Sequence, residues 1–177
     1  LVGGRDEPAP GSSRDAKANL GALAELGVGN DVPGPPTKAS VMEFAAHGPC
    51  PKFSKYSGSI EWRNAIFLFV NVGGSDYTNL FFDGGARMSW YAGGRQTEES
   101  PIIQRLLSKG CSPRLLFCRQ QGQGGPPSAY VFCGQLEYVR HYPGTMPLEV
   151  EWRLMDADKL AGSERFIELM DSAGQAT

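Results

Sequence analysis

The chain has 177 residues, of which 41% are hydrophobic and 20% charged, with a formal net charge of -2. This length can bury one sizeable core, and the charge excludes the strongly basic coat that drives non-specific nucleic-acid binding while leaving room for a local basic groove. No run reaches the about 18 apolar residues that span a bilayer, and no signal peptide is visible. Because the chain begins with Leu, we expect an excised domain of a larger protein or complex, or a processed product. Cysteines within apolar strand patterns suit a reducing compartment, so we expect an intracellular location, nuclear or organellar in a eukaryote and otherwise cytoplasmic.

The N-terminal part is rich in Gly and Pro. Residues 13–26 have loosely periodic leucines and predict a helix, which a second Gly/Pro stretch at 27–38 would tether rather than integrate. Residues 41–46 predict one more helical turn. We therefore expect two regions: an N-terminal helix and linker over 1–58 and the folded domain over 59–177.

About six short strands follow, with one helix among them. The strand at 65–72 is apolar on both faces and is expected to be central, whereas 148–154 alternates apolar and polar residues. Gly134 interrupts a long strand pattern and predicts a bulge. Phe166, Ile167, Leu169 and Met170 are expected to face inward from a final helix. The expected fold is α+β, a small, partly open antiparallel or mixed β-barrel with an inserted helix and flanking N- and C-terminal helices. The predicted strands lie at 65–72, 77–82, 88–92, 115–119, 129–140 and 148–154.

The stretch 87–109 reads as a strand, a polar loop and the inserted helix. Trp90 and Tyr91 are adjacent on the strand and must face opposite sides, so one belongs to the core and the other can stack on a planar ring. We favour Trp90 as the platform, against the alternative of a core Trp. Ser100 is placed to cap the helix, with Pro101 as its first residue.

Four cysteines and two histidines are present, and no Cys-x-x-Cys pair occurs. A structural zinc site needs closely paired ligands, so we expect neither a metal nor a cofactor. Cys118 and Cys133 lie in apolar strand patterns and are expected to be small buried hydrophobic residues. No glycine-rich phosphate loop is present, which argues against nucleotide hydrolysis.

Residues 64–160 resemble the PUA-like β-barrel superfamily, which includes the SRA, YTH and EVE domains. They are most similar to the uncharacterised C-terminal domain of some bacterial helicase–nuclease proteins of restriction type. The resemblance implies a barrel that holds a modified base, in some relatives flipped out of a duplex, in an aromatic pocket. It is carried by Ser-Pro-Ile-Ile-Gln at 100–104, Leu-Leu-Phe-Cys-Arg at 115–119, Tyr-Val-Phe-Cys-Gly-Gln-Leu-Glu-Tyr at 130–138, His141, and Pro-Leu-Glu-Val-Glu-Trp-Arg-Leu at 147–154.

The site candidates are planar, hydrogen-bonding or cationic side chains that suit a base and its phosphates. Their alternative roles are structural: core packing, loop and cap hydrogen bonds, or surface ion pairs. Tyr130, Phe132 and Tyr138 are expected to share one face because of their even spacing. The base-binding candidates are Trp90, Tyr91, Arg95, Gln96 and Thr97; the phosphate-binding candidates are Arg87, Ser100, Arg105 and Arg119; further pocket candidates are His141 and Tyr138.

Three functions follow as hypotheses. The first is a non-catalytic reader of DNA or RNA that recognises a modified or flipped base, with no membrane partner. The second is a protein-interaction or scaffold domain. The third is a nuclease that uses Glu98 or Glu99 with His141, although adjacent carboxylates do not naturally face one point, and stabilising the helix N-terminus is their simpler role.

Overall fold

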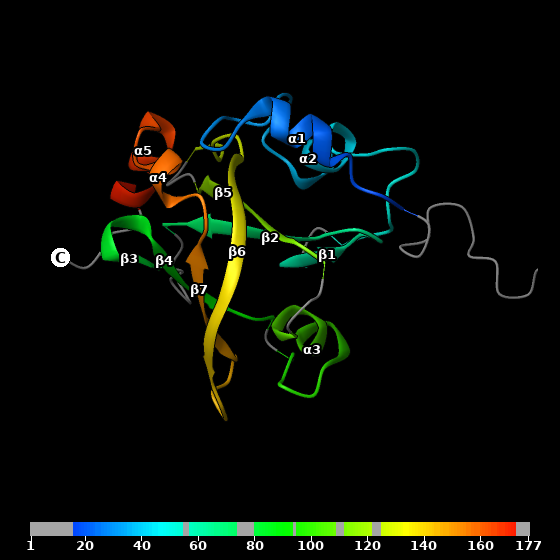
Figure 1. The fold of residues 1–177 in the computed structure, drawn as a ribbon, viewed down its shortest axis with the longest axis vertical. Coiled ribbons are helices and arrows are strands. Elements are labelled where there is room, and N and C mark those ends of the chain that lie inside the picture. Colours follow the sequence, from blue (N-terminus) through cyan, green and yellow to red (C-terminus); the bar gives the residue numbers. More distant parts are fainter. Residues whose placement is uncertain are drawn as a thin grey trace, which may run out of the picture.

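The structure is a computed structural model that describes residues 16–54, 57–73, 80–93, 95–108, 112–121 and 125–172. A seven-stranded mixed sheet curls strongly into a half-barrel (Figure 1). Its order is β1-β2-β5-β6-β7-β4-β3, and only β2 and β5 pair in parallel. This confirms the predicted α+β class, and the curled mixed sheet is compatible with the predicted partly open barrel. Strand β1 was not indicated by the sequence. The strands are β1 (Ser59–Glu61), β2 (Ile66–Val72), β3 (Leu80–Phe82), β4 (Arg87–Tyr91), β5 (Arg114–Gln120), β6 (Val131–Tyr142) and β7 (Glu149–Leu154).

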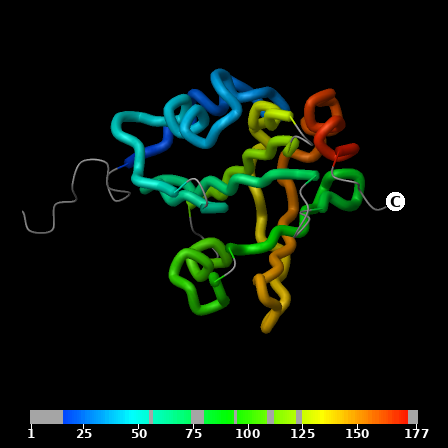
Figure 2. The backbone as a smooth tube through the Cα atoms, turned by 180° about the vertical axis from the view of Figure 1, so that it is seen from behind, coloured from blue at the N-terminus to red at the C-terminus, as the bar shows by residue number. Residues whose placement is uncertain are grey.

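Helices pack on both faces of the sheet. On the concave face, α3 lies near one end and α4 and α5 lie near the other, as two opposite views agree (Figures 1 and 2). The inserted helix α3 follows the prediction, with Pro101 as its first residue and Ile103 and Leu106 buried. The described part contains α1 (Leu20–Leu26), α2 (Lys38–Phe44), α3 (Pro101–Leu107), α4 (Ala157–Leu160) and α5 (Glu164–Ser172).

The N-terminal segment differs from its prediction. Helix α1 begins at Leu20, later than predicted, because the Asn19 side chain accepts a hydrogen bond from the Ala22 N–H at 3.0 Å and caps it there. The residues before it are extended, and Ala18 bridges to Ala46. Leu23 and Met42 are buried in a core shared with the sheet. Residues 16–54 are thus a packed layer rather than a tethered arm.

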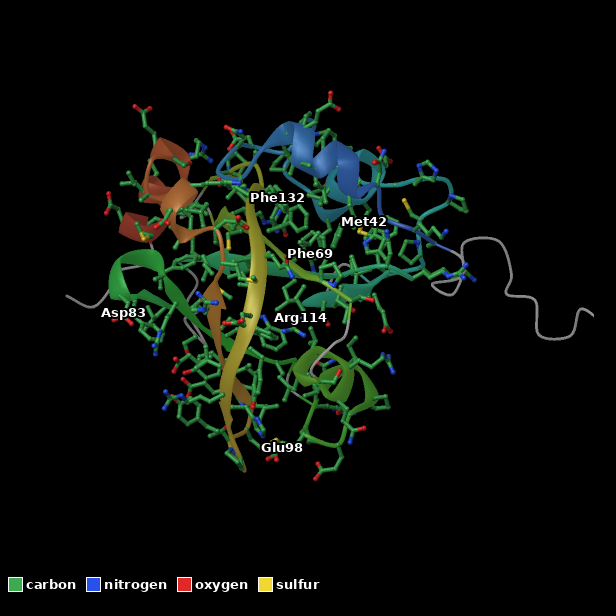
Figure 3. All side chains as sticks on the ribbon, in the orientation of Figure 1. Met42, Phe69, Asp83, Glu98, Arg114 and Phe132 are labelled. Atoms are coloured by element: carbon green, nitrogen blue, oxygen red, sulfur yellow. The ribbon has the colours of Figure 1, made fainter. Side chains whose placement is uncertain are left out.

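Two cores lie on opposite faces of the sheet. Under α1 and α2, the rings of Phe67, Phe69, Phe117 and Phe132 pack with centroids 4.7 to 6.3 Å apart. Figure 3 shows Met42, Phe69 and Phe132 in this layer. The concave face carries the other core, which α3 and α5 help to close. Cys118 and Cys133 are buried there as free thiols, as expected.

The C-terminal helix fits its prediction with one exception. The Ser163 hydroxyl accepts from the Phe166 N–H at 3.2 Å, and Phe166 and Leu169 are buried. Ile167 is 40% exposed, contrary to expectation. It follows Phe166 directly, so it is turned by about 100° around the helix, away from the core.

Strand β6 changes the direction of its side chains at Gly134. This residue has a φ of 82°, and the register with β5 shifts beside it, which confirms the predicted bulge. Phe132 therefore faces α1 and α2, whereas Leu136 and Tyr138 face the concave side. The expectation that Tyr130, Phe132 and Tyr138 share a face is wrong, because even spacing holds only in an uninterrupted ladder.

Candidate functional site

The Trp90–Tyr91 pair divides between the two faces, as expected for adjacent strand residues. Trp90 is 3% exposed and belongs to the concave core. A base cannot stack on this ring in the folded domain, so Trp90 takes the core role rather than that of the platform. Tyr91 is half-buried on the other face, where burial and the nearby Glu149 carboxylate raise its pKa.

The polar loop before α3 is held largely by its own hydrogen bonds. The Gln96 Oε1 atom accepts from the Gly93 N–H at 3.0 Å, and the Thr97 hydroxyl donates to Glu99 Oε2 at 3.0 Å. Ser100 occupies the N-cap position, but its hydroxyl accepts from the Thr97 N–H at 2.9 Å rather than from the helix. Arg95 is exposed.

Two of the predicted phosphate contacts are ion-paired and lie on different elements. Arg87 Nη1 lies 2.9 Å from Glu151 Oε2, on the outer face of β4 and β7. Arg105 Nε lies 2.6 Å from Glu61 Oε2, at α3 and β1. A phosphate at either position would have to displace a carboxylate. Arg119 lies elsewhere, at the end of β5, and its contacts are described below.

A second irregularity in β6 brings Tyr138 and His141 together. Tyr138 pairs with Trp152 and His141 pairs with Val150, and the register shifts between them at Val139. Trp152 and Val150 belong to the concave core, so both β6 side chains face this side although they are three residues apart. In a regular strand this spacing would place them on opposite faces.

The result is a continuous row of side chains on the concave side, which we call the inner-face row: Glu98, His141, Tyr138, Trp152 and Arg114. The Glu98 Oε2 and His141 Nε2 atoms lie 3.5 Å apart, and His141 Nδ1 lies 2.6 Å from the Tyr138 hydroxyl. The Gly144 N–H donates to the other Glu98 oxygen at 3.0 Å, fixing the carboxylate to the β6–β7 turn. The row therefore links the loop before α3 to β6 through hydrogen-bonding groups.

Aromatic and cationic groups form the deeper end of this row. The Tyr138 and Trp152 rings meet edge to face with centroids 6.1 Å apart, and the Arg114 guanidinium lies 5.3 Å from the Trp152 ring centroid. The Arg114 Nη1 atom donates to the Ser108 carbonyl at 3.2 Å. Trp152 is fully buried, and its indole N–H has no hydrogen-bond partner among the described residues.

Exposure falls along the row. The side chains of Glu98 and His141 are 36% and 24% exposed, whereas Trp152 is inaccessible. Figure 3 shows Arg114 and Glu98 on the α3 side of β6, with Glu98 nearer the free end of the β6–β7 ribbon. The row thus offers solvent a carboxylate and an imidazole, with aromatic rings behind them.

A cavity of about 350 Å³ lies between α1, α4 and the bulge of β6. Its walls include Leu23, Leu115 and Phe132, and its polar groups include Asp156 and Lys159. One Asp156 oxygen already accepts from the Gln135 N–H at 3.1 Å. None of the predicted site residues lines this cavity.

No protein-family model matches the sequence, and no curated protein matches it significantly. Within the described ranges, no three His, Cys, Asp or Glu side chains are grouped as metal ligands would be. No helix in that same part of the chain has both the length and the apolar character needed to cross a bilayer.

Proposed function

We propose that this domain is a nucleic-acid-binding module that holds an unstacked base, modified or flipped, against the inner-face row. The observation that carries the proposal is the His141–Tyr138–Trp152 arrangement, in which an accessible imidazole is backed by aromatic rings on the concave side of a half-barrel. The resemblance of residues 64–160 to PUA-like domains supports the same reading.

The chemistry of the row suits a base. Stacking of a base on an aromatic side chain contributes about 1–3 kcal/mol, and extruding a base from a duplex costs a few kcal/mol. Glu98 can accept from an exocyclic amino group. The His141 Nε2 atom, which lies 3.5 Å from Glu98, can donate to or accept from a base edge, whereas Nδ1 is bonded to Tyr138. The base contacts therefore move from Trp90 to His141 and Tyr138, with Gln96 and Thr97 in the adjoining loop.

The test is fluorescence anisotropy with short DNA and RNA strands, plain and base-modified, at two salt concentrations. We expect selective binding of one strand type, weakened at least tenfold by His141→Ala. The matched control is His47→Ala, because His47 is the other histidine of the chain and is exposed near α2. Equal losses of affinity in the two variants, or no binding at low salt, would refute the base-binding proposal. The protein-interaction hypothesis would then become the leading one.

A second candidate function is strand cleavage, and the Glu98–His141–Tyr138 arrangement favours it. In it the imidazole lies 3.5 Å from a carboxylate oxygen and is hydrogen-bonded to a hydroxyl at 2.6 Å. In hydrolytic enzymes, nucleophiles are activated by a histidine that acts as general base, is oriented by a carboxylate and is hydrogen-bonded to a hydroxyl. His141 would accept a proton from a water whose oxygen attacks phosphorus. A new P–O bond to this oxygen would form as the P–O bond to the leaving sugar oxygen breaks, and the leaving oxygen would take the proton from the imidazolium.

Cleavage is tested by incubating labelled strands with the wild-type domain and with Glu98→Gln. The matched control is Glu99→Gln, because Glu99 contacts Thr97 rather than His141. Product that Glu98→Gln abolishes and Glu99→Gln preserves would establish a nuclease. If the wild-type domain leaves the strands intact, cleavage is refuted and binding remains the proposed function.

A further inference from the structure

Two cations, which we call the cation pair, meet on the face of the sheet opposite the inner-face row. They are Lys38, the first residue of α2, and Arg119, near the end of β5. The Arg119 guanidinium donates to Asn71 Oδ1 at 2.7 Å and to the Pro36 carbonyl. The Lys38 ammonium donates to the Ser57 carbonyl. All three of these acceptors are neutral.

The cation pair lies over two touching aromatic rings. The Lys38 Nζ atom is 5.6 Å from the Phe69 ring centroid, and the Arg119 Cζ atom is 4.7 Å from that of Tyr130. The two rings meet edge to face with centroids 5.3 Å apart. Figure 3 shows Phe69 between β2 and the helices α1 and α2. Both cationic side chains are half-buried, which weakens the screening of their charges by water.

This arrangement changes the pKa of the lysine. Burial, and then the charge of Arg119, lower the pKa of Lys38 from 10.5 to about 8. An anion bound between the two groups would favour the charged ammonium and reverse this shift. The site therefore holds positive potential that a ligand of opposite charge would relieve.

Two further features point to a ligand at this place. The Tyr130 residue is 2% exposed, and its hydroxyl has no hydrogen-bond partner among the described residues. Asn71 and Arg119 are paired near the carboxyl ends of the parallel strands β2 and β5. In open α/β sheets, ligands bind outside the carboxyl ends of the parallel strands, and β2 and β5 are the parallel pair within this otherwise antiparallel sheet of described strands.

We propose that Lys38 and Arg119 bind a phosphoryl group. A guanidinium offers a planar fork and an ammonium a point charge, and the Tyr130 phenol beside Arg119 adds a third kind of donor. A phosphoryl group has three oxygens to meet them, whereas a carboxylate has two. The group would come either from a small phosphorylated molecule or from the backbone of a nucleic-acid strand. This inference does not rest on the proposed function, because the two sites lie on opposite faces.

The experiment follows the Lys38 side-chain resonance by NMR during titration with inorganic phosphate, at constant ionic strength set with sodium chloride. We expect saturable shifts at Lys38 and Arg119, and a pKa of Lys38 that rises by about one unit in saturating phosphate. This measurement needs only the wild-type domain, so it is independent of whether any variant folds. Shifts that are absent, or that grow linearly without saturation, would overturn the site.

Variants then assign the contact. Arg119→Gln should weaken phosphate binding at least tenfold, because it removes one of the two charges. The matched control is Arg105→Gln, since Arg105 is paired with Glu61 and should change the affinity less than twofold. Equal losses in the two variants would contradict the assignment to the cation pair.

Three further titrations identify the source of the phosphoryl group. Adenosine monophosphate and a single-stranded oligothymidylate are compared with inorganic phosphate, and a polyglutamate peptide serves as a carboxylate probe. Much tighter binding of the oligonucleotide assigns the site to nucleic acid, and comparable binding of the monophosphate assigns it to a small molecule. Binding of polyglutamate without binding of phosphate would overturn the proposal.

Discussion

Two regions of the molecule each bring two cationic side chains together, and their surroundings differ. On the outer face of β4, β7 and β6, the Glu151 carboxylate receives Arg87 at 2.9 Å and Arg140 at 3.5 Å. At the end of β5, Arg119 meets the amide oxygen of Asn71, a backbone carbonyl and a second cation, Lys38. In the first region the cations are paired with a carboxylate, whereas in the second two cations lie near each other.

This difference distinguishes charged side chains that stabilise the fold from charged side chains that can bind a ligand. Glu151 is the one charged residue that is buried among the described residues, and it holds the strands together through arginines that its own charge attracts. Lys38 and Arg119 instead repel each other, and this repulsion is, after burial, a cause of the lowered pKa of Lys38. A charged group with a perturbed pKa, which a bound anion would stabilise, is typical of a binding site.

The largest expected effect is that of Glu151→Gln. Because the carboxylate is 7% exposed and contacts two guanidiniums, its neutralisation should lower the free energy of unfolding by about 2–3 kcal/mol. Urea denaturation measures this loss. The control is Glu137→Gln, whose pair with Arg153 is half-exposed and should contribute about 0.5 kcal/mol or less. Equal effects would contradict the central role of Glu151.

The lowered pKa of Lys38 predicts that the stability of the domain depends on pH. Because the pKa of Lys38 is about 8 in the folded state and near 10.5 in the unfolded state, the unfolded chain binds the additional proton between these values. The free energy of unfolding of the wild type should therefore rise with pH in this window relative to Lys38→Met, by on the order of 1 kcal/mol. Below pH 8 the difference between the two should be constant. A difference independent of pH up to 10.5 would refute the shift.

The sequence predicted the features that short segments determine. Helix α3 has its Ser-Pro start and apolar stripe within one segment, β2 is a continuous apolar run, and Gly134 marks a bulge by its residue type. The second bulge, at Val139, has no such mark, so the meeting of Tyr138 and His141 could not be foreseen. The Lys38–Arg119 contact depends on how α2 packs across the sheet, which no local pattern encodes.

Two tyrosine hydroxyls sharpen the comparison on a smaller scale. In the first region, the Tyr142 hydroxyl donates to Glu151 Oε1 at 3.3 Å. Tyr142→Phe removes this hydrogen bond and should lower the free energy of unfolding by about 0.5–1 kcal/mol. Thermal and urea unfolding measure the loss. If Glu151→Gln is already present, Tyr142→Phe should cost less, because the charged acceptor is gone.

Tyr130→Phe should have the smallest effect on folding and the opposite sign. The Tyr130 hydroxyl is buried beside the cation pair without a hydrogen bond to any described residue, so its removal relieves a desolvation cost. The free energy of unfolding should stay unchanged or rise by up to about 1 kcal/mol. Phosphate affinity, measured on the same variant, should fall, because the ligand loses a donor. A variant that is clearly less stable would show that the hydroxyl serves the fold, and the contrast between the two regions would then be one of packing rather than of charge.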